Sequence, residues 1–362
     1  MKLGIIGLPN VGKSTLYNAL TMAGAHVANY PFCTIEPNIG TVPVPDPRID
    51  HLRGMFSLEK TVHATIEFID IAGLVKGASQ GHGLGNQFLS HIRQTQAICH
   101  VVRCFEDKDI AHVSGAVNPE EDINTIKTEL LLADLETVDR AFSKAEKQAR
   151  SEPKAYTDSI DFYASIRNHL NDGLQAVSFH ADPSHATLME GLFLLTAKPV
   201  IYVANVDESG ITTDNPHVEA VRKTAQSENA RFIKICAKLE EEAMLFGEQE
   251  KQEFLNLSGI RISGLQNLVI QSYALLNYIS FITFNEKEVR AWTLENGTTA
   301  REAAGRIHSD IERGFIRAET ISYDELLLCG SWSHAREKGS LRIEGKEYRV
   351  QDGDVILFRF HV

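Results

Sequence analysis

Short apolar runs alternate with amphipathic stretches along most of the chain. Buried strands are predicted over residues 3–6, 64–70, 97–105, 199–205 and 231–236. Helices are predicted over residues 15–20, 48–56, 87–93, 218–227 and 262–276. Strands that alternate with helices in this way predict an α/β fold built on a parallel sheet.

One interval between predicted strands is too long for a single crossover helix. Such a crossover needs about a dozen residues or more, whereas residues 106–198 separate two strands here. Apolar residues recur at helical spacing over 122–150, a Ser-Glu-Pro break follows, and a second helix is predicted over 156–170. We therefore expect an inserted antiparallel helical hairpin. Its turn carries basic residues that either meet an acidic partner or only aid solubility: Lys144, Lys147, Arg150 and Lys154.

The hydrophobic pattern changes after residue 278. Residues 281–284 and 289–294 alternate as a strand pair, and residues 299–313 read as a helix. Residues 348–350 and 355–360 flank Gln351-Asp352-Gly353-Asp354, which predicts a hairpin turn. This order is typical of a small α+β domain, and we expect it to dock a partner. The predicted segments are a nucleotide-binding domain (1–118 and 198–278), the helical arm (119–197) and the C-terminal domain (279–362).

Composition narrows the class of protein. The chain has 362 residues, of which 43% are hydrophobic and 23% charged, as in a soluble protein of two or three domains. Its five cysteines form no C-x-x-C pair, which argues against a zinc site or a disulfide framework. No apolar run approaches the ~20 residues that cross a bilayer. A strand predicted near the first residue leaves no room for a signal peptide, so we expect a cytoplasmic protein. The net charge of −12 argues against indiscriminate coating of nucleic acid.

The strongest chemical signal is a G-x-x-x-x-G-K-[ST] phosphate loop at residues 7–14. Gly7 and Gly12 allow a tight turn whose N–H groups point at phosphate oxygens, next to the positive end of a helix. Lys13 is expected to reach the β- and γ-phosphates, and the Ser14 hydroxyl to bind Mg²⁺. The nucleotide-binding residues predicted in this loop are Asn10, Val11, Gly12, Lys13, Ser14 and Thr15.

A second motif narrows the chemistry to a switch-type NTPase. Asp70 ends a predicted strand and begins D-x-x-G, so it is expected to hold Mg²⁺ together with Thr34, while the Gly73 N–H meets the γ-phosphate. A glutamine that positions the attacking water often follows this glycine, but Leu74 cannot hydrogen-bond water. The catalytic candidates are therefore Lys13, Gly73 and one of two loop histidines, His82 or His112.

The base-side segment departs from the N-K-x-D motif that reads guanine. Here it is Asn205-Val206-Asp207-Glu208, and Glu208 has one methylene too many to place its carboxylate on the guanine edge. We predict that Asn205 serves the base edge, that Val206 packs on the ring, and that ATP is preferred over GTP, because guanine loses two hydrogen bonds to a carboxylate. Cys236-Ala237-Lys238 is the other predicted base-side segment.

These motifs, with Asn29-Tyr30-Pro31-Phe32 and the C-terminal stretch, make the chain resemble the YchF family of Obg-like ATPases along its whole length. The resemblance implies a P-loop NTPase domain of G-domain type, a helical arm and a ubiquitin-like TGS domain. It also implies ribosome association, a role in translation or a stress response, and ATP hydrolysis without the usual glutamine. Asn10 resembles an asparagine that binds K⁺ in related NTPases, so K⁺ dependence is a hypothesis.

Other functions remain open at this point. The chain could be a GTPase or dual-specificity enzyme, a nucleotide-gated binding module with little catalysis, or a small-molecule phosphotransferase, although a separate substrate-binding signature is missing. We expect a monomer with no membrane partner. RNA contact is a further hypothesis, through basic residues of the arm or of the C-terminal domain.

Overall fold

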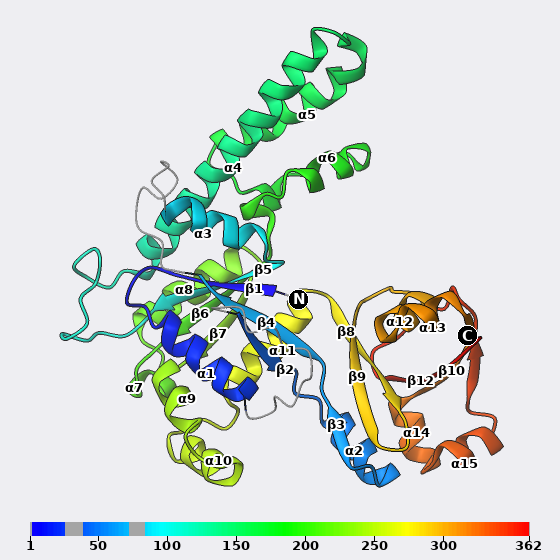
Figure 1. Ribbon diagram of the computed structural model, residues 1–362. Coiled ribbons are helices and arrows are strands. Elements are labelled where there is room, and N and C mark those ends of the chain that lie inside the picture. The colour runs from blue at the N-terminus through cyan, green and yellow to red at the C-terminus, as the bar shows by residue number, and fades with distance from the viewer. Residues whose placement is uncertain (1, 26–38, 72–83, 362) are drawn as a thin grey trace. The chain divides into compact units, whose positions relative to one another are not determined.

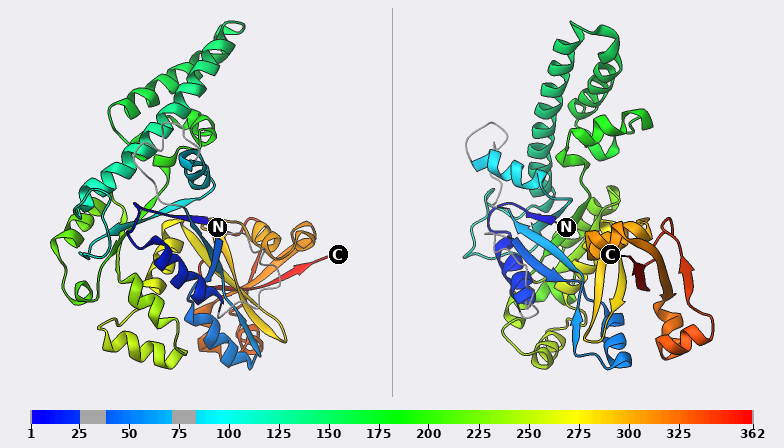
Figure 2. Two further views of the ribbon diagram at one scale, coloured as in Figure 1. Left: turned by 60° about the vertical axis from the view of Figure 1, so that its left-hand side comes forward. Right: turned by 45° about the vertical axis from the view of Figure 1, so that its right-hand side comes forward.

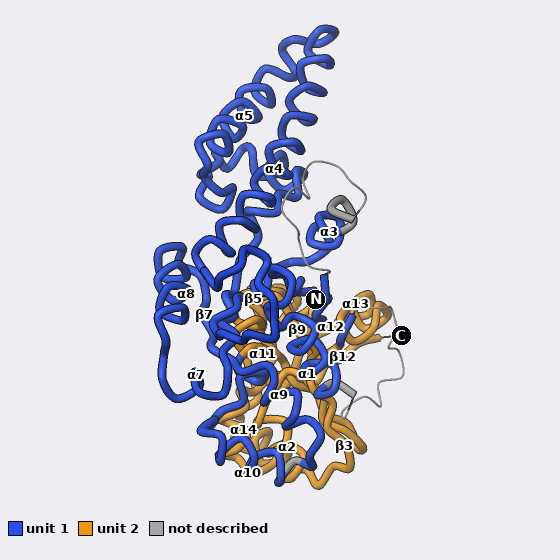
Figure 3. The backbone as a smooth tube through the Cα atoms, turned by 90° about the vertical axis from the view of Figure 1, so that its left-hand side faces the viewer, with its two compact units in different colours: residues 1–40, 67–267 blue, residues 41–66, 268–362 orange. Residues whose placement is uncertain are grey.

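The computed structural model describes residues 2–25, 39–71 and 84–361. Two compact units result: residues 1–40 with 67–267, and residues 41–66 with 268–362 (Figure 3). Residues 41–66, which the sequence places in the nucleotide-binding domain, thus pack with the C-terminal part of the chain. The finer division into four segments remains a prediction.

A six-stranded sheet organises the first unit, in the order β2-β4-β1-β5-β6-β7 (Figure 1). Strand β1 pairs with β4 and β5, and β6 with β5 and β7, all in parallel. The strand bounds are β1 Lys2–Ile6, β2 Ile39–Pro43, β4 Thr65–Asp70, β5 Ala97–Arg103, β6 Val200–Asn205 and β7 Arg231–Ile235. Every residue of β5 is buried. This confirms the α/β class and brings the carboxyl ends of the strands to one edge.

Among the described residues, the helices around this sheet include the four that the hydrophobic pattern predicts over residues 15–20, 87–93, 218–227 and 262–276, and four that it does not predict. They are α1 Lys13–Ala25, α3 Leu84–Arg93, α6 Ala186–Gly191, α7 Ser209–Thr212, α8 Pro216–Ser227, α9 Ala237–Ala243 and α10 Glu248–Leu257, with α11 Gly264–Leu275 crossing the boundary between the units. Within the described residues, each helix is too short or too polar to span a bilayer.

The predicted helical hairpin is present as α4 Pro119–Ala149 and α5 Pro153–Asn171, which lie side by side (Figure 1, Figure 2). Asn118 caps α4 by accepting from the Glu121 N–H, and a proline occupies the first turn. Asp134 lies at the base of the arm and is fully buried. Its carboxylate accepts from the Leu195 N–H at 2.7 Å and the Thr196 N–H at 2.8 Å, which fixes the returning chain. The basic residues at the turn are exposed.

The second unit contains another six-stranded sheet, in the order β11-β10-β12-β8-β9-β3. Its strands are β3 Lys60–Val62, β8 Tyr278–Phe284, β9 Glu288–Glu295, β10 Phe315–Ser322, β11 Arg342–Glu344 and β12 Asp354–Phe360. Its helices are α2 Pro47–Phe56, α12 Ala300–Ile307, α13 Ser309–Arg313, α14 Tyr323–Cys329 and α15 Trp332–Glu337. Strands β8 and β9 are antiparallel, as predicted, and the α+β architecture of this unit is confirmed.

Two local predictions in this unit are wrong. The helix expected over 299–313 breaks at His308, which is extended (φ −164°) and whose Nδ1 accepts from the Asp310 N–H to start α13. The hairpin expected across residues 351–354 does not form. Instead, Tyr348 and Val350 bond to the chain around the start of α12, through Ala300 N–H to Tyr348 O at 2.7 Å and Val350 N–H to Thr298 O at 3.1 Å. Strand β12 pairs with β10 and β8.

Candidate functional site

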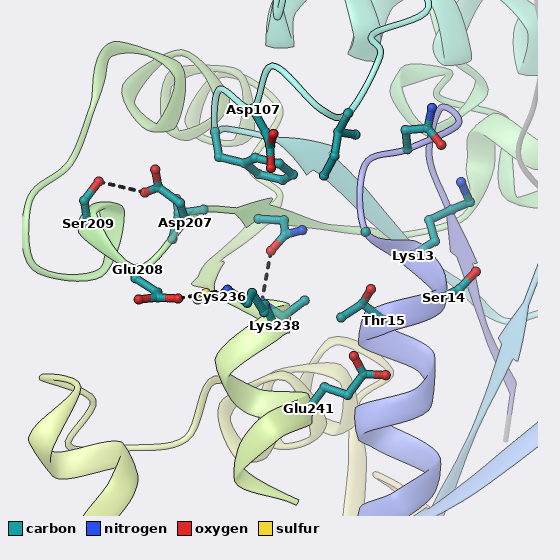
Figure 4. Close-up of a pocket in the computed structure, with 17 residues that line it drawn as sticks. Lys13, Ser14, Thr15, Asp107, Asp207, Glu208, Ser209, Cys236, Lys238 and Glu241 are labelled. Carbon is teal, nitrogen blue, oxygen red and sulfur yellow. Dashed lines mark hydrogen bonds and ion pairs between the residues drawn. The ribbon is translucent and has the colours of Figure 1, made fainter.

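A cavity of about 800 Å³ lies at the carboxyl ends of β1, β5, β6 and β7 (Figure 4). This volume is in the range of small-molecule and cofactor sites. The residues that line it come from four loops and the helices that follow: Asn10, Gly12, Lys13, Ser14, Thr15, Phe105, Asp107, Ile110, Asn205, Val206, Asp207, Glu208, Ser209, Cys236, Ala237, Lys238 and Glu241. Most nucleotide-binding residues predicted from the sequence therefore line this cavity. The exception is Val11, whose side chain is buried and does not line the cavity.

The loop between β1 and α1 has the backbone that the phosphate-loop motif requires. Gly12 (φ +94°) and Asn10 (φ +62°) lie in the left-handed region. A Cβ atom on Gly12 would collide with the Asn205 side-chain nitrogen, and one on Gly7 would lie 2.5 Å from the Val101 carbonyl oxygen. Glycine is thus required at both positions by conformation and by space.

Lys13 is buried at the start of α1, and its Nζ donates to the Leu8 carbonyl oxygen at 2.7 Å. Burial lowers the pKa of Lys13 to about 8, and the charge of Asp70 opposes this shift. A desolvated ammonium in this loop interacts strongly with an incoming anion, since little water screens it.

Ser14 and Asp70 fit a Mg²⁺ ion. The Asp70 carboxylate is hydrogen-bonded to Ser14, yet its Oδ1 is buried without a partner. Burial raises the pKa of Asp70, while Lys13 and Ser14 lower it. Among the described residues, no cluster of three or more His, Cys, Asp or Glu side chains could hold a metal on its own. This donor set suits Mg²⁺, which binds one or two protein oxygens and takes the rest from phosphate and water.

Asn205 connects the two ends of the cavity. It is buried, its Nδ2 donates to the Val11 carbonyl at 2.9 Å, and its Oδ1 accepts from the Ala237 N–H at 3.0 Å. Both ends of the amide therefore hold the phosphate loop against the start of α9. This arrangement favours a positioning role over the base contact that the sequence suggests.

The other base-side residues have different environments. Val206 is buried, whereas Glu208 and Lys238 are more than half exposed and form an ion pair at 3.1 Å. The hydrogen bond to Glu208 raises the pKa of Lys238. Asp207 accepts from the Gly210 N–H at 2.8 Å and from the Ser209 hydroxyl, which fixes its side chain against the first residues of α7. Cys236 is buried at the start of α9, and burial raises the pKa of its thiol.

Sequence reasoning missed one wall of the cavity, formed by Phe105, Asp107 and Ile110. Their loop is shaped by Arg103, which is fully buried at the end of β5. Its guanidinium donates to the carbonyl oxygens of all three residues, at 3.1 Å to Phe105, 3.2 Å to Asp107 and 3.0 Å to Ile110. An arginine inside an otherwise apolar strand was the signal in the sequence, because a buried guanidinium needs several acceptors.

The same loop continues to His112. The Asn10 side chain, on the phosphate loop, donates to the Ala111 carbonyl oxygen at 3.1 Å. This hydrogen bond holds Ala111, the residue before His112, at the phosphate loop. The His112 side chain is 3% exposed, its Nε2 lies 3.0 Å from Asp122 Oδ2 on α4, and its Nδ1 accepts from the Ser114 N–H. In this conformation the imidazole faces the arm helix and does not line the cavity.

Three predicted site residues fall outside the described residues: Thr34, Gly73 and His82. The same holds for Leu74 and for Asn29-Tyr30-Pro31-Phe32. The assignments that rest on them remain predictions.

The comparisons with known proteins agree with this geometry. A family model described as a 50S ribosome-binding GTPase matches residues 2–138, and a model named YchF-GTPase_C, described as a protein of unknown function (DUF933), matches residues 278–361. The ribosome-binding ATPase YchF of Bacillus subtilis (strain 168) is 51% identical over 361 residues, covering 99% of this chain and 99% of that protein. The chain belongs to the YchF family.

Two further members of the YchF family extend the comparison. The ribosome-binding ATPase YchF of Escherichia coli O157:H7 is 48% identical and is aligned over 100% of this chain and 99% of its own length. A solved structure of the Schizosaccharomyces pombe YchF GTPase is 36% identical, with a TM-score of 0.90, covering 99% of this chain and 97% of that one. The chain therefore shares the P-loop fold of the YchF family and is similar to these members over nearly its whole length.

Proposed function

We propose that this protein is a ribosome-associated ATPase switch, which binds Mg-ATP and hydrolyses it to ADP and phosphate. One observation carries the proposal: Gly12, Lys13, Ser14 and Asn205 meet in a single nucleotide-sized cavity. The names of the relatives support it, since those from B. subtilis and E. coli are called ribosome-binding ATPases. We expect the protein to act as a cytoplasmic monomer in translation or in a stress response.

At the phosphate end, Lys13 exchanges its bond to the Leu8 carbonyl for the β- and γ-phosphate oxygens. The N–H groups that follow Gly12 orient the phosphate chain at the start of α1. Ser14 and Asp70 hold Mg²⁺, with Thr34 as the third proposed ligand. When bound, this ion neutralises charge that develops on the phosphate oxygens.

At the base end, we propose a preference for ATP over GTP. The Glu208 carboxylate is directed at Lys238 in an exposed ion pair. Guanine would need this carboxylate to leave Lys238 and to reach its N1–H and 2-amino groups with an extra methylene in the way. Adenine lacks those donors and requires no such change.

Paired titrations of the purified protein with ATP and GTP test this preference. We expect GTP to bind at least about tenfold more weakly, which corresponds to the loss of one to two hydrogen bonds to a charged acceptor. Tighter binding of GTP would favour the GTPase alternative, in line with the description of the S. pombe relative. Binding of neither nucleotide would remove the proposal altogether.

For catalysis, we propose that His112 or His82 positions the attacking water. His112 is adjacent to Ala111, which Asn10 holds at the phosphate loop, but its ring must leave Asp122 to reach the cavity. His112→Ala should lower single-turnover hydrolysis by roughly a hundredfold, with ATP affinity unchanged. His82→Ala serves as the paired variant. Wild-type hydrolysis rates in both variants would remove the idea that either histidine positions the attacking water.

Two partners of the proposed switch have separate tests. Co-sedimentation with ribosomes in the presence of ATP or ADP should differ, because the bound nucleotide is expected to set the affinity for the ribosome. Equal pelleting with both nucleotides would contradict the switch. For K⁺, which we propose to bind at Asn10, hydrolysis should be faster in KCl than in NaCl. The Asn10→Ala variant should lose this difference.

A further inference from the structure

An arginine cluster stands on an exposed face of the second sheet, well away in sequence from every residue of the nucleotide cavity. Arg317 on β10, Arg359 on β12 and Arg336 on α15 all direct guanidinium nitrogens at one carboxylate, that of Glu319. Arg359 binds it in a bidentate manner, at 3.0 and 3.1 Å. Arg336 lies at 3.0 Å and Arg317 at 3.5 Å.

The charges in this arginine cluster do not balance. Three guanidinium groups share one carboxylate, and Glu319 is held ionised because the bond from Arg359 lowers its pKa. Each guanidinium carries several N–H donors, whereas one carboxylate offers roughly four acceptor sites. The arginine side chains are 44–58% exposed, while that of Glu319 is 10% exposed. The cluster therefore presents surplus positive charge and surplus donors to solvent.

Stability alone does not account for this arrangement. Arg317 and Arg359 are directly opposite each other in the β10–β12 ladder, where like charges repel. Arg359 alone satisfies both oxygens of the nearly buried Glu319, so the additional pairs from the half-exposed Arg317 and Arg336 return at most about 1 kcal/mol each. On the opposite face of these strands, Ala318, Ile356 and Phe358 are buried in an apolar core, as is usual for the inner face of a sheet. A cationic face with unused planar donors is what recognition of phosphate groups requires.

We propose that the arginine cluster of Arg317, Arg336 and Arg359 binds the phosphodiester backbone of RNA. This inference rests on the proposed ribosome association and assigns residues to it. RNA fits better than an acidic protein, because phosphates accept bidentate bonds from several guanidinium groups in succession and bases stack on guanidinium planes. Ile343, which is 69% exposed and lies opposite Glu319 on β11, adds an apolar contact on the same face.

The test uses the full chain and fluorescence anisotropy of a labelled single-stranded oligouridylate over a series of KCl concentrations. Arg317→Gln combined with Arg359→Gln should weaken binding roughly tenfold at low salt. The same double variant should lower the slope of log K against log [salt] by about two, one for each lost phosphate contact. Arg306→Gln removes an exposed arginine from α12 and serves as the matched control with no change.

Glu319→Gln gives the diagnostic result, because it removes the negative charge inside the cluster and keeps the side-chain shape. RNA affinity should stay equal or rise, opposite in sign to the arginine variants, whereas a purely structural cluster would move all variants in one direction. Thermal unfolding and ATP titration on the same preparations show that each variant is folded and binds nucleotide, which separates this test from that of the proposed function. Equal RNA binding by the native chain and the double arginine variant, or displacement of RNA by polyglutamate at equal charge concentration, would overturn the proposal.

Discussion

The two ends of the nucleotide cavity are built differently. At the phosphate end, consecutive residues of one loop supply the contacts, and Lys13 is buried within the loop that it serves. At the base end, the wall is assembled from three separate loops, and its charged pair of Glu208 and Lys238 stands in solvent. For the proposed function, the difference teaches that the phosphate contacts are encoded locally and tolerate little change. Base selection depends on packing between distant segments, so it can change with less harm to the fold.

The largest effect is expected from Gly12→Ala. Gly12 has a left-handed backbone, and the added methyl group would meet the Asn205 side chain. ATP affinity should fall by at least about a hundredfold in a titration with a fluorescent ATP analogue, because the N–H groups of the loop no longer converge. Gly54→Ala is the matched control: this glycine lies in α2 with open space around its Cβ position, so binding should not change. Equal losses of ATP affinity in both variants would contradict the proposed difference between the two ends of the cavity.

Asn205→Ala should affect both ends of the cavity at once. It leaves the Val11 carbonyl and the Ala237 N–H without their present partners in a buried place. We expect the free energy of unfolding to fall by about 2–4 kcal/mol, with a matching loss of ATP affinity, since each orphaned group costs about 1–3 kcal/mol. Chemical denaturation measures this. Asn205→Asp keeps the acceptor for Ala237 but turns a buried carboxylate oxygen toward the Val11 carbonyl oxygen, so it should lose at least as much stability. A free energy of unfolding equal to that of the native chain in the alanine variant would show that the two ends of the cavity are independent.

The pH dependence should separate the two ends. The pKa of Lys13 is lowered to about 8, so the free protein carries the charged ammonium below this pH and loses it above. ATP affinity should therefore be constant below about pH 7.5 and fall as the pH rises from 8 to 9, by at most about tenfold per pH unit. Adenosine, which lacks phosphates, is the control and should show no such fall. A parallel decline for adenosine would assign the titration to the base end.

The smallest effect is expected at the exposed ion pair. Lys238→Gln and Glu208→Gln should each change the free energy of unfolding by less than about 0.5 kcal/mol, because both side chains are more than half exposed. A double-mutant cycle with ATP binding as the readout should give a coupling of no more than about 1 kcal/mol. A larger coupling would mean that the pair closes over the bound base, and the contrast between the two ends would then weaken.

A large part of the fold was predictable from the sequence alone. Each buried strand of the first sheet carries a short apolar run, and the surplus of residues between β5 and β6 correctly predicted the arm. The hairpin error in the second unit has a local cause. Asp354 accepts from the Gln351 N–H at 2.9 Å and from the Tyr348 hydroxyl at 2.7 Å. The Asp354 side chain therefore closes the residues of the expected turn into a bend. Strand β12 pairs with β10 and does not form the predicted hairpin.

The sequence by itself determined the phosphate loop, because the conformation of a glycine-rich turn between a strand and a helix depends on adjacent residues. Only the tertiary structure decided the rest of the site. Arg103 shapes the wall at residues 105–110, Asn205 joins two loops, and His112 meets Asp122 of the arm. These contacts join residues whose spacing along the chain follows no period. They form because a buried polar group needs a hydrogen-bond partner, which the fold can supply from any part of the chain.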